Sequence, residues 1–246
     1  MQDANEVSFY YADGISGIDS GTAFVQEVLE GIDKRHLGIE FGIEAQVTPT
    51  IKLTGVASLG QYTYDNNPNL LLTSSDFIEG LNFGEANLEN YKIAGGPQRA
   101  FSLGFEYRDP NYWWFGTTAN FMSNAYVDVS PLTRTENFYL DTDGLPFPDY
   151  DPALAKELLR QEKFDSYMVW NAVGGKSWKV GDKYISLFVS LNNILNTQFK
   201  TGGFEQGRNA NYQSLKEDVN APKRRFGPKY WFGRGTTYFM NLNLRF

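Results

Sequence analysis

Leu37-Gly-Ile-Glu-Phe-Gly-Ile-Glu-Ala-Gln-Val47 alternates without a break between apolar side chains and Gly, Glu or Gln. A period of two residues predicts a β-strand that has one apolar and one polar face. Thr48-Pro-Thr50 interrupts the alternation, which then resumes over Ile51–Leu59. Two strands separated by so short a break predict an antiparallel hairpin.

Further segments with the same period follow along the chain. A turn at Asp109-Pro-Asn111 and another at Gly181-Asp-Lys183 each join two of them. The segments are Phe101–Tyr107 with Trp113–Val127, Tyr167–Lys179 with Ile185–Leu191, and a last strand, Thr236–Phe246. Tyr167–Lys179 carries apolar residues on both faces, so the pattern does not predict its orientation.

Long polar segments separate these hairpins: Asn66–Gln98, Ser130–Asp165 and Lys200–Gly233. Tight turns at one end of the strands and long loops at the other are typical of outer-membrane barrels. The predicted fold is all-β, a transmembrane antiparallel β-barrel segment of about seven or eight strands with long extracellular loops. Within the second loop, Asp151-Pro152 predicts the start of a short helix over Ala153–Gln161.

Aromatic residues make up 16% of the chain and concentrate at the predicted strand ends. Trp113 and Trp178 flank two of the tight turns, whereas Tyr64 and Tyr126 lie at the long-loop ends. Two belts of amphipathic rings agree with the aromatic girdles of a membrane barrel. The mean hydropathy of −0.42 does not argue against this fold, because lipid-facing and lumen-facing residues alternate and cancel.

The composition excludes several classes of function. The net charge of −7 argues against a nucleic-acid partner, and the absence of cysteine excludes disulfides and thiolate metal sites. No run of about 18 apolar residues predicts a transmembrane helix. The polar segment after Met1 has no signal-peptide pattern, so for an exported barrel we expect Met1 not to be the natural start.

Several segments resemble the C-terminal barrel of TonB-dependent receptors, in particular the SusC-like, carboxypeptidase-regulatory type of Bacteroidetes. They are Gly38-Ile-Glu-Phe-Gly-Ile-Glu-Ala with the following Thr-Pro-Thr turn, Leu59-Gly-Gln-Tyr-Thr-Tyr, Gly96-Pro-Gln-Arg-Ala-Phe-Ser-Leu-Gly-Phe-Glu-Tyr-Arg and Leu191-Asn-Asn-Ile-Leu-Asn. The alternating C-terminal strand resembles the signal that the barrel-assembly machinery recognises. Its residues are Tyr238, Met240, Leu242, Leu244 and Phe246.

The resemblance implies that residues 1–246 are the C-terminal part of a larger barrel of about 22 strands, whose plug domain is not in this chain. It implies a nutrient transporter, not an enzyme, that takes up a glycan, a peptide or an iron chelate. Its implied partners are outer-membrane lipid, the remainder of the receptor, the TonB protein acting through the plug, the assembly machinery and a surface lipoprotein. No cofactor is implied.

No catalytic or metal site is predicted from the residues. Asp141-Thr-Asp-Gly144 lacks the spacing of a calcium loop, and His36 has no second histidine near it. Glu40, Glu44 and Glu106 are expected on the polar lumen face rather than at a substrate. The basic cluster at Lys223-Arg-Arg225 is expected to pair mainly with acidic loop residues.

Two other interpretations remain open at this point. The chain could form an autonomous barrel of eight strands with a structural or adhesive role, closed by a strand near Glu6–Tyr11. It could also form a soluble carbohydrate-binding β-sandwich, in which the apolar faces pack between two sheets.

Overall fold

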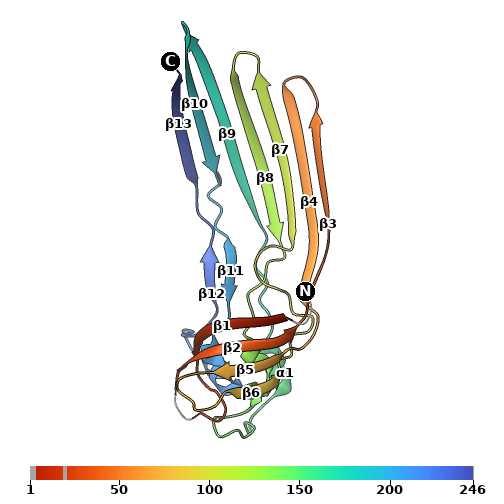
Figure 1. Cartoon of the computed structure of the whole chain (residues 1–246), viewed down its shortest axis with the longest axis vertical. Coiled ribbons are helices and arrows are strands. Elements are labelled where there is room, and N and C mark those ends of the chain that lie inside the picture. Colours follow the sequence, from red (N-terminus) through yellow and green to blue (C-terminus); the bar gives the residue numbers. More distant parts are fainter. Residues whose placement is uncertain (1–3, 19–20, 246) are drawn as a thin grey trace.

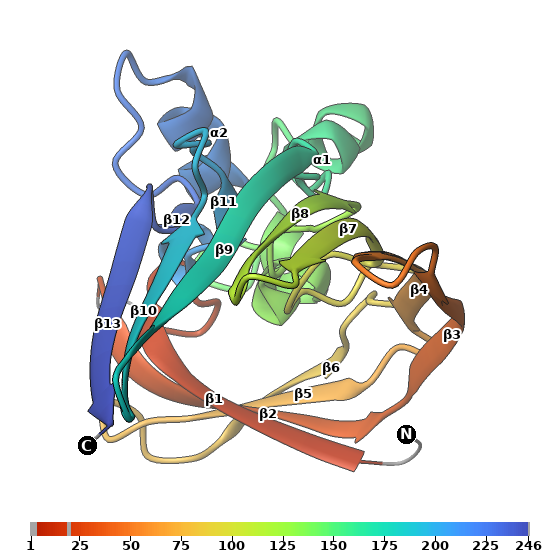
Figure 2. The same ribbon diagram turned by 90° about the horizontal axis from the view of Figure 1, so that it is seen from above.

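The computed structural model describes residues 4–18 and 21–245. Its largest element is a seven-stranded antiparallel sheet in the order β13-β10-β9-β8-β7-β4-β3, which we call the wall. The strands are β3 (Lys34–Gln46), β4 (Ile51–Tyr64), β7 (Arg99–Asp109), β8 (Trp113–Ser123), β9 (Tyr167–Val180), β10 (Lys183–Asn192) and β13 (Thr237–Arg245). Figure 2 shows the wall as an arc.

The register of the wall aligns one predominantly apolar face of each of the seven strands on the same side of the sheet. Ile39 lies opposite Leu59, Leu103 opposite Ala119, and Val189 opposite Met240. Register also resolves the orientation of β9, because Trp170 pairs with Ala119 on the apolar face. The apolar face is exposed, so it is not the inner face of a sandwich in the described part of the chain. That contradicts the sandwich interpretation.

The three tight turns lie together at one end of the wall, and the predicted long loops lie at the other (Figure 1). The turn between β9 and β10 contains Gly181 with φ of +64°, a conformation that glycine adopts without strain. The described C-terminal strand β13 also ends at the turn end (Figure 1). This arrangement confirms the prediction that the tight turns lie at one end of the strands and the long segments at the other.

A second, compact part lies at the loop end of the wall, and we call it the cap. Its sheet has the order β1-β2-β5-β6 and runs across the direction of the wall strands (Figure 1). The strands are β1 (Ala4–Ala12), β2 (Ala23–Ile32), β5 (Asn69–Thr73) and β6 (Leu81–Glu85). Val25, Leu70, Leu72, Leu88 and Leu132 form the centre of its buried core.

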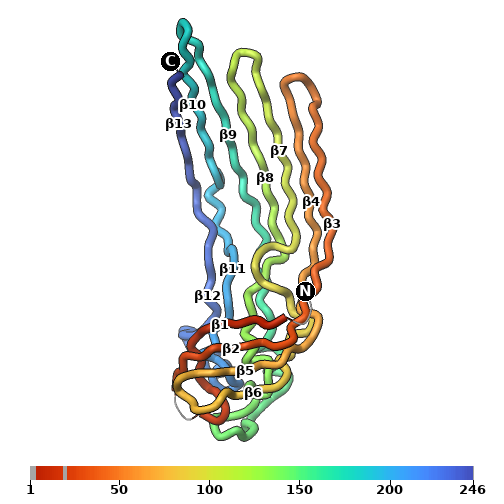
Figure 3. The backbone as a smooth tube through the Cα atoms, in the orientation of Figure 1, coloured from red at the N-terminus to blue at the C-terminus, as the bar shows by residue number. Residues whose placement is uncertain are grey.

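The two later loops complete the cap. One contains η1 (Pro131–Arg134), η2 (Glu136–Tyr139) and α1 (Pro152–Leu158); the other contains β11 (Lys200–Phe204), η3 (Gly207–Asn209), α2 (Tyr212–Asn220) and β12 (Lys229–Phe232). Figure 3 follows the backbone from β10 through β11 into the cap and back through β12 to β13. Among the described residues, no helix has the length and apolar character needed to cross a membrane.

Several expectations are corrected by these elements. The three long segments are folded, because they bury apolar side chains in the cap. The strand expected over Trp113–Val127 ends at Ser123, where Asn124 takes a φ of +58° and the chain turns into the cap. The helix expected to Gln161 begins as predicted, with the Asp151 side chain accepting from the Ala153 amide, but it ends at Leu158.

The alternative interpretation, in which a strand near Glu6–Tyr11 closes a small barrel, is contradicted. The strand forms, but β1 pairs with β2 in the cap sheet, where Ser8 and Tyr10 both donate hydrogen bonds to Glu27. Within residues 4–18 and 21–245, no strand lies between the wall edges β3 and β13. The wall is therefore a partial barrel.

Candidate binding site

A cavity of about 740 Å³ lies in the cap, between the β1–β2 hairpin and the segment from β11 to β12. Its volume is in the range of small-molecule sites. The lining combines carboxylates, basic side chains and aromatic rings from parts of the chain that are far apart in sequence. We take this cavity as the candidate binding site.

Glu27 is the most buried carboxyl group of the cavity, with an exposed fraction of 3%. It lies on β2 directly opposite Ser8 on β1. Its carboxylate accepts hydrogen bonds from Tyr10 Oη at 2.5 Å and from Ser8 Oγ at 3.2 Å. Burial raises the pKa of Glu27 to about 7, although the two hydrogen bonds act in the opposite direction.

Asp128 brings a second carboxyl group to the same cavity. Backbone hydrogen bonds hold it beside β11: its amide donates to the Gly203 carbonyl at 2.8 Å, and its carbonyl accepts from the Glu205 amide at 2.9 Å. The side chain is exposed to the cavity but surrounded by protein on its other sides. This partial desolvation, together with the charges of Glu6 and Glu205, raises the pKa of Asp128 to about 6.

Basic side chains line a different part of the cavity. The Arg208 guanidinium lies 6.0 Å from the centre of the Tyr11 ring and 5.5 Å from that of Phe226. Arg225 and Lys229 also line it, and both are exposed. In the described parts of the chain, none of these three basic groups has a carboxylate within 4.0 Å.

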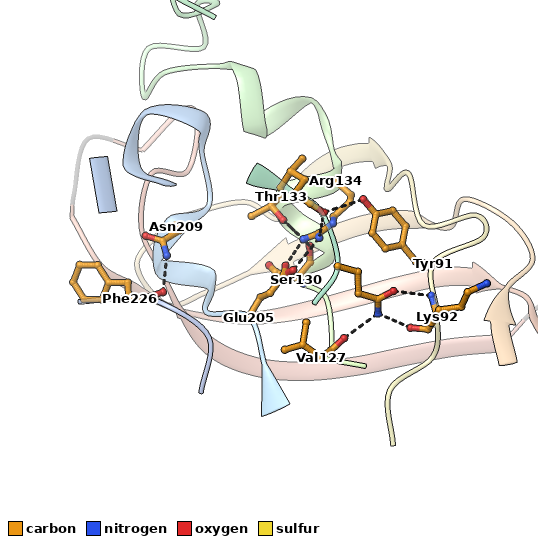
Figure 4. Close-up of polar contacts among 11 residues, drawn as sticks. Tyr91, Lys92, Val127, Ser130, Thr133, Arg134, Glu205, Asn209 and Phe226 are labelled. Carbon is orange, nitrogen blue, oxygen red and sulfur yellow. Dashed lines mark hydrogen bonds and ion pairs between the residues drawn. The ribbon is translucent and has the colours of Figure 1, made fainter. Parts of the chain in front are cut away.

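A buried arginine, Arg134, joins the three loops of the cap (Figure 4). Arg134 pairs with Glu205 of the third loop and donates to the Leu159 carbonyl at 2.9 Å. Its guanidinium also lies 5.0 Å from the centre of the Tyr91 ring of the first loop. Gln161 adds a second link, because its side chain bonds both backbone groups of Lys92.

Of the residues singled out from the sequence, Tyr64, Arg225 and most of Glu6–Tyr11 line this cavity, whereas the residues of the C-terminal strand lie away from it. Tyr238, Met240, Leu242 and Leu244 are exposed on the apolar face of β13, as their alternation predicted, and Phe246 lies outside the described residues. Nothing in the geometry tests their role in barrel assembly, which stays a prediction.

The acidic residues considered earlier are also dispersed. On the polar face of the wall, Glu106 pairs with Arg108 at 2.6 Å, and Glu44 lies 3.4 Å from Lys52. The Asp141 carboxylate accepts hydrogen bonds from the backbone amides of Asp143 and Leu145. The acidic segment Asp141–Gly144 is therefore a turn that Asp141 stabilises.

The remaining candidates form local contacts. His36 stacks beside Tyr62 with ring centroids 4.9 Å apart. In the basic cluster, Arg224 pairs with the acidic loop residue Asp218 at 3.3 Å, as predicted, whereas Arg225 lines the cavity instead.

Glu27, Asp128 and Arg208 were missed from the sequence. One local signal could have pointed to Glu27. It stands in an alternating series with Ala23, Val25 and Leu29, so a carboxylate shares the buried face of β2 with apolar side chains. The meeting of Asp128 with β11, and of Arg208 with β1, depends on long-range packing that has no local pattern.

Comparison with known proteins agrees with the arrangement of the wall. A family model described as "TonB dependent receptor-like, beta-barrel" matches residues 5–194, which include six of the seven wall strands and the cap up to the segment from β11 to β12. No curated protein matches the sequence significantly. Since the family model covers most of the chain, the chain belongs to the TonB-dependent receptor-like β-barrel family.

Proposed function

We propose that this chain forms the C-terminal part of the barrel of an outer-membrane, TonB-dependent transporter that imports a nutrient. The carrying observation is the apolar face of the wall, which continues in register across all seven strands and is exposed on six of them and half-buried on β10. Outer-membrane barrels present such a face to lipid and a polar face to the lumen. In this proposal the apolar face contacts the hydrocarbon layer.

The lengths of the wall strands support this orientation. They range from 9 to 14 residues, and a tilted strand of about 9–11 residues crosses the hydrocarbon core. The polar face carries side chains such as Glu40, Thr118 and Asn171, which suit a hydrated or plugged lumen.

The unpaired edges support a larger barrel. β3 and β13 each lack a second partner strand among the described residues, and an open sheet edge is not tolerated in lipid. We therefore propose that further strands of the receptor pair with both edges, and that a plug domain fills the lumen. The TonB protein would act through that plug, and β13 would be the strand that the assembly machinery recognises.

The cap lies at the end opposite the tight turns, so the proposal places it outside the cell, where it contacts the nutrient. The SusC-like subtype, with a surface lipoprotein over the mouth, is the form that the sequence resemblance favours. Family and geometry favour binding and uptake, not an enzymatic reaction.

The orientation can be tested by cysteine labelling, because this chain contributes no cysteine of its own and the unsubstituted receptor gives the background. In the complete receptor, Ile78→Cys places a thiol on an exposed cap loop, and Asp182→Cys places one in the β9–β10 turn. A membrane-impermeant maleimide should label the first variant in intact cells and the second only after lysis. Labelling of both sites, or of the turn alone, in intact cells would contradict the proposal.

A further inference from the structure

The cavity in the cap separates opposite charges along β1. At one part of it lie Glu27 and Asp128, and neither has a cationic partner within 4.0 Å in the part of the chain that the structure describes. At another part lies Arg208, which contacts Tyr11. A buried carboxylate without a cation is costly, and a bound cationic group would relieve that cost.

The path between the two charged parts follows from the strand. Glu27 pairs with Ser8, whereas Arg208 contacts Tyr11, three residues farther along β1. Successive side chains of a strand point to opposite faces, so Tyr11 lies on the face of β1 opposite to Ser8 and Glu27. Since β1 is an edge strand and residues of both its faces line the cavity, a ligand that contacts both charged parts must be elongated.

The rest of the lining suits the body of such a molecule. Phe204 and Trp231 present rings 5.6 Å apart, and Phe226 adds a third ring. Ser130 also lines the cavity; its side-chain oxygen is buried and has no hydrogen-bond partner in the structure. A buried hydroxyl without a partner is unusual in a folded protein and indicates a polar group that a ligand can satisfy.

We propose that the cap cavity binds a linear zwitterion with the chemistry of a short peptide. Its ammonium group would lie at Glu27 and Asp128, its carboxylate at Arg208, and its side chains against the aromatic rings. Arg225 and Lys229 add positive charge for the carboxylate. This inference rests on the proposed uptake function and assigns its substrate class.

The test measures binding to the purified complete receptor in detergent by titration calorimetry. The probes are Ala-Phe-Ala with free ends, its N-acetylated form and its C-amidated form. We expect the free tripeptide to bind, and each blocked form to bind about tenfold to a hundredfold more weakly, because each loses one charge-assisted contact. Equal binding of the three forms, or binding of none, would overturn the proposal.

Substitutions assign each end of the ligand. The double variant Asp128→Asn with Glu27→Gln should weaken binding of the free tripeptide but leave binding of the N-acetylated form unchanged. Arg208→Gln should likewise weaken binding of the free tripeptide but leave binding of the C-amidated form unchanged. Glu30→Gln is the matched control, because Glu30 lies on the exposed face of the same strand β2. An equal loss in the control would show non-specific attraction and would contradict the proposed site.

Failure of this inference can be separated from failure of the proposed function. If cysteine labelling places the cap outside the cell but no peptide binds, the peptide assignment alone is wrong. If labelling places the cap on the inner side, the uptake proposal is wrong whatever the calorimetry shows.

Discussion

The wall and the cap arrange their apolar side chains in opposite ways. In the cap, residues such as Leu70 and Leu132 are fully buried within a core that both sheet and loops enclose. In the wall, Ile39 and Leu103 are 73% and 70% exposed. The cap therefore obtains its stability as a water-soluble domain does, from burial and internal hydrogen bonds, whereas the wall requires an apolar surrounding and neighbouring strands. The two parts should respond differently to the same kind of substitution.

The largest effect is expected at Arg134. Arg134→Ala leaves Glu205 partly buried without its cation, and removing one partner of a buried ion pair costs roughly 3–5 kcal/mol. Hydrogen exchange of the complete receptor should show faster exchange in the cap loops and unchanged exchange in the wall. Lys216→Ala is the control, because it breaks the exposed pair with Asp149 and should cost less than about 1 kcal/mol. Equal effects of the two variants would refute this role for Arg134.

The next largest effect is expected from the same substitution made on the two opposite faces of the wall. Ile39 and Glu40 are neighbours in the middle of β3 and point to opposite faces. Ile39→Arg should destabilise the inserted barrel by about 2–4 kcal/mol, because it places a charge in the hydrocarbon layer, whereas Glu40→Arg faces the lumen. The measurement is the fraction of receptor in outer membranes that shows heat-modifiable migration on a gel. If both variants insert equally well, the apolar face does not contact lipid.

Alternation predicted the wall well because its signal is local. Each strand of a single-layer membrane sheet has one apolar face, so β3 and β4 could be recognised from their own residues. β9 was ambiguous because Val169 and Val173 also make its second face apolar, and only pairing with β8 and β10 resolves it.

The cap could not be predicted in the same way. In β2, Phe24 and Val28 lie on the more exposed face while Glu27 is buried, so the hydrophobic pattern does not identify the face. The pairing of β2 with β5, and of Arg134 with Glu205, joins residues distant in sequence. The candidate cavity arises from these pairings, and its residues become neighbours only after the cap has folded.

A third effect concerns pH and is confined to the cap. The pKa of Glu27 is raised from 4.5 to about 7 by burial, so the folded cap binds a proton that the unfolded cap releases between these values. Its contribution to stability is fully present below about pH 4.5 and is lost as the pH rises through about 7. For a shift of this size the loss is roughly 3 kcal/mol.

Glu27→Gln should remove this loss, because an amide does not ionise and can still accept from Tyr10. Asp13 and Asp128 also have pKa values raised to about 6, so their contribution is lost at lower pH. The difference between the variant and the unchanged receptor should therefore be clearest between pH 6 and 7. Hydrogen exchange of β1 and β2, corrected for intrinsic rates, measures it, and an unchanged pH dependence would contradict the assignment.

The smallest effect is expected at the start of α1. The Asp151 carboxylate accepts from the Ala153 amide at 2.8 Å and satisfies one of the free donors of the first turn. Asp151→Ala should destabilise the cap by about 1 kcal/mol, and Asp151→Asn, which can still cap the helix, should have little effect. Ala155 of this helix packs beside Phe138, so loss of the hydrogen bond from Asp151 to the helix start should increase hydrogen exchange in both segments. If the alanine variant changed exchange in the wall instead, cap and wall would not be separate units of stability, and the comparison between them would have to be abandoned.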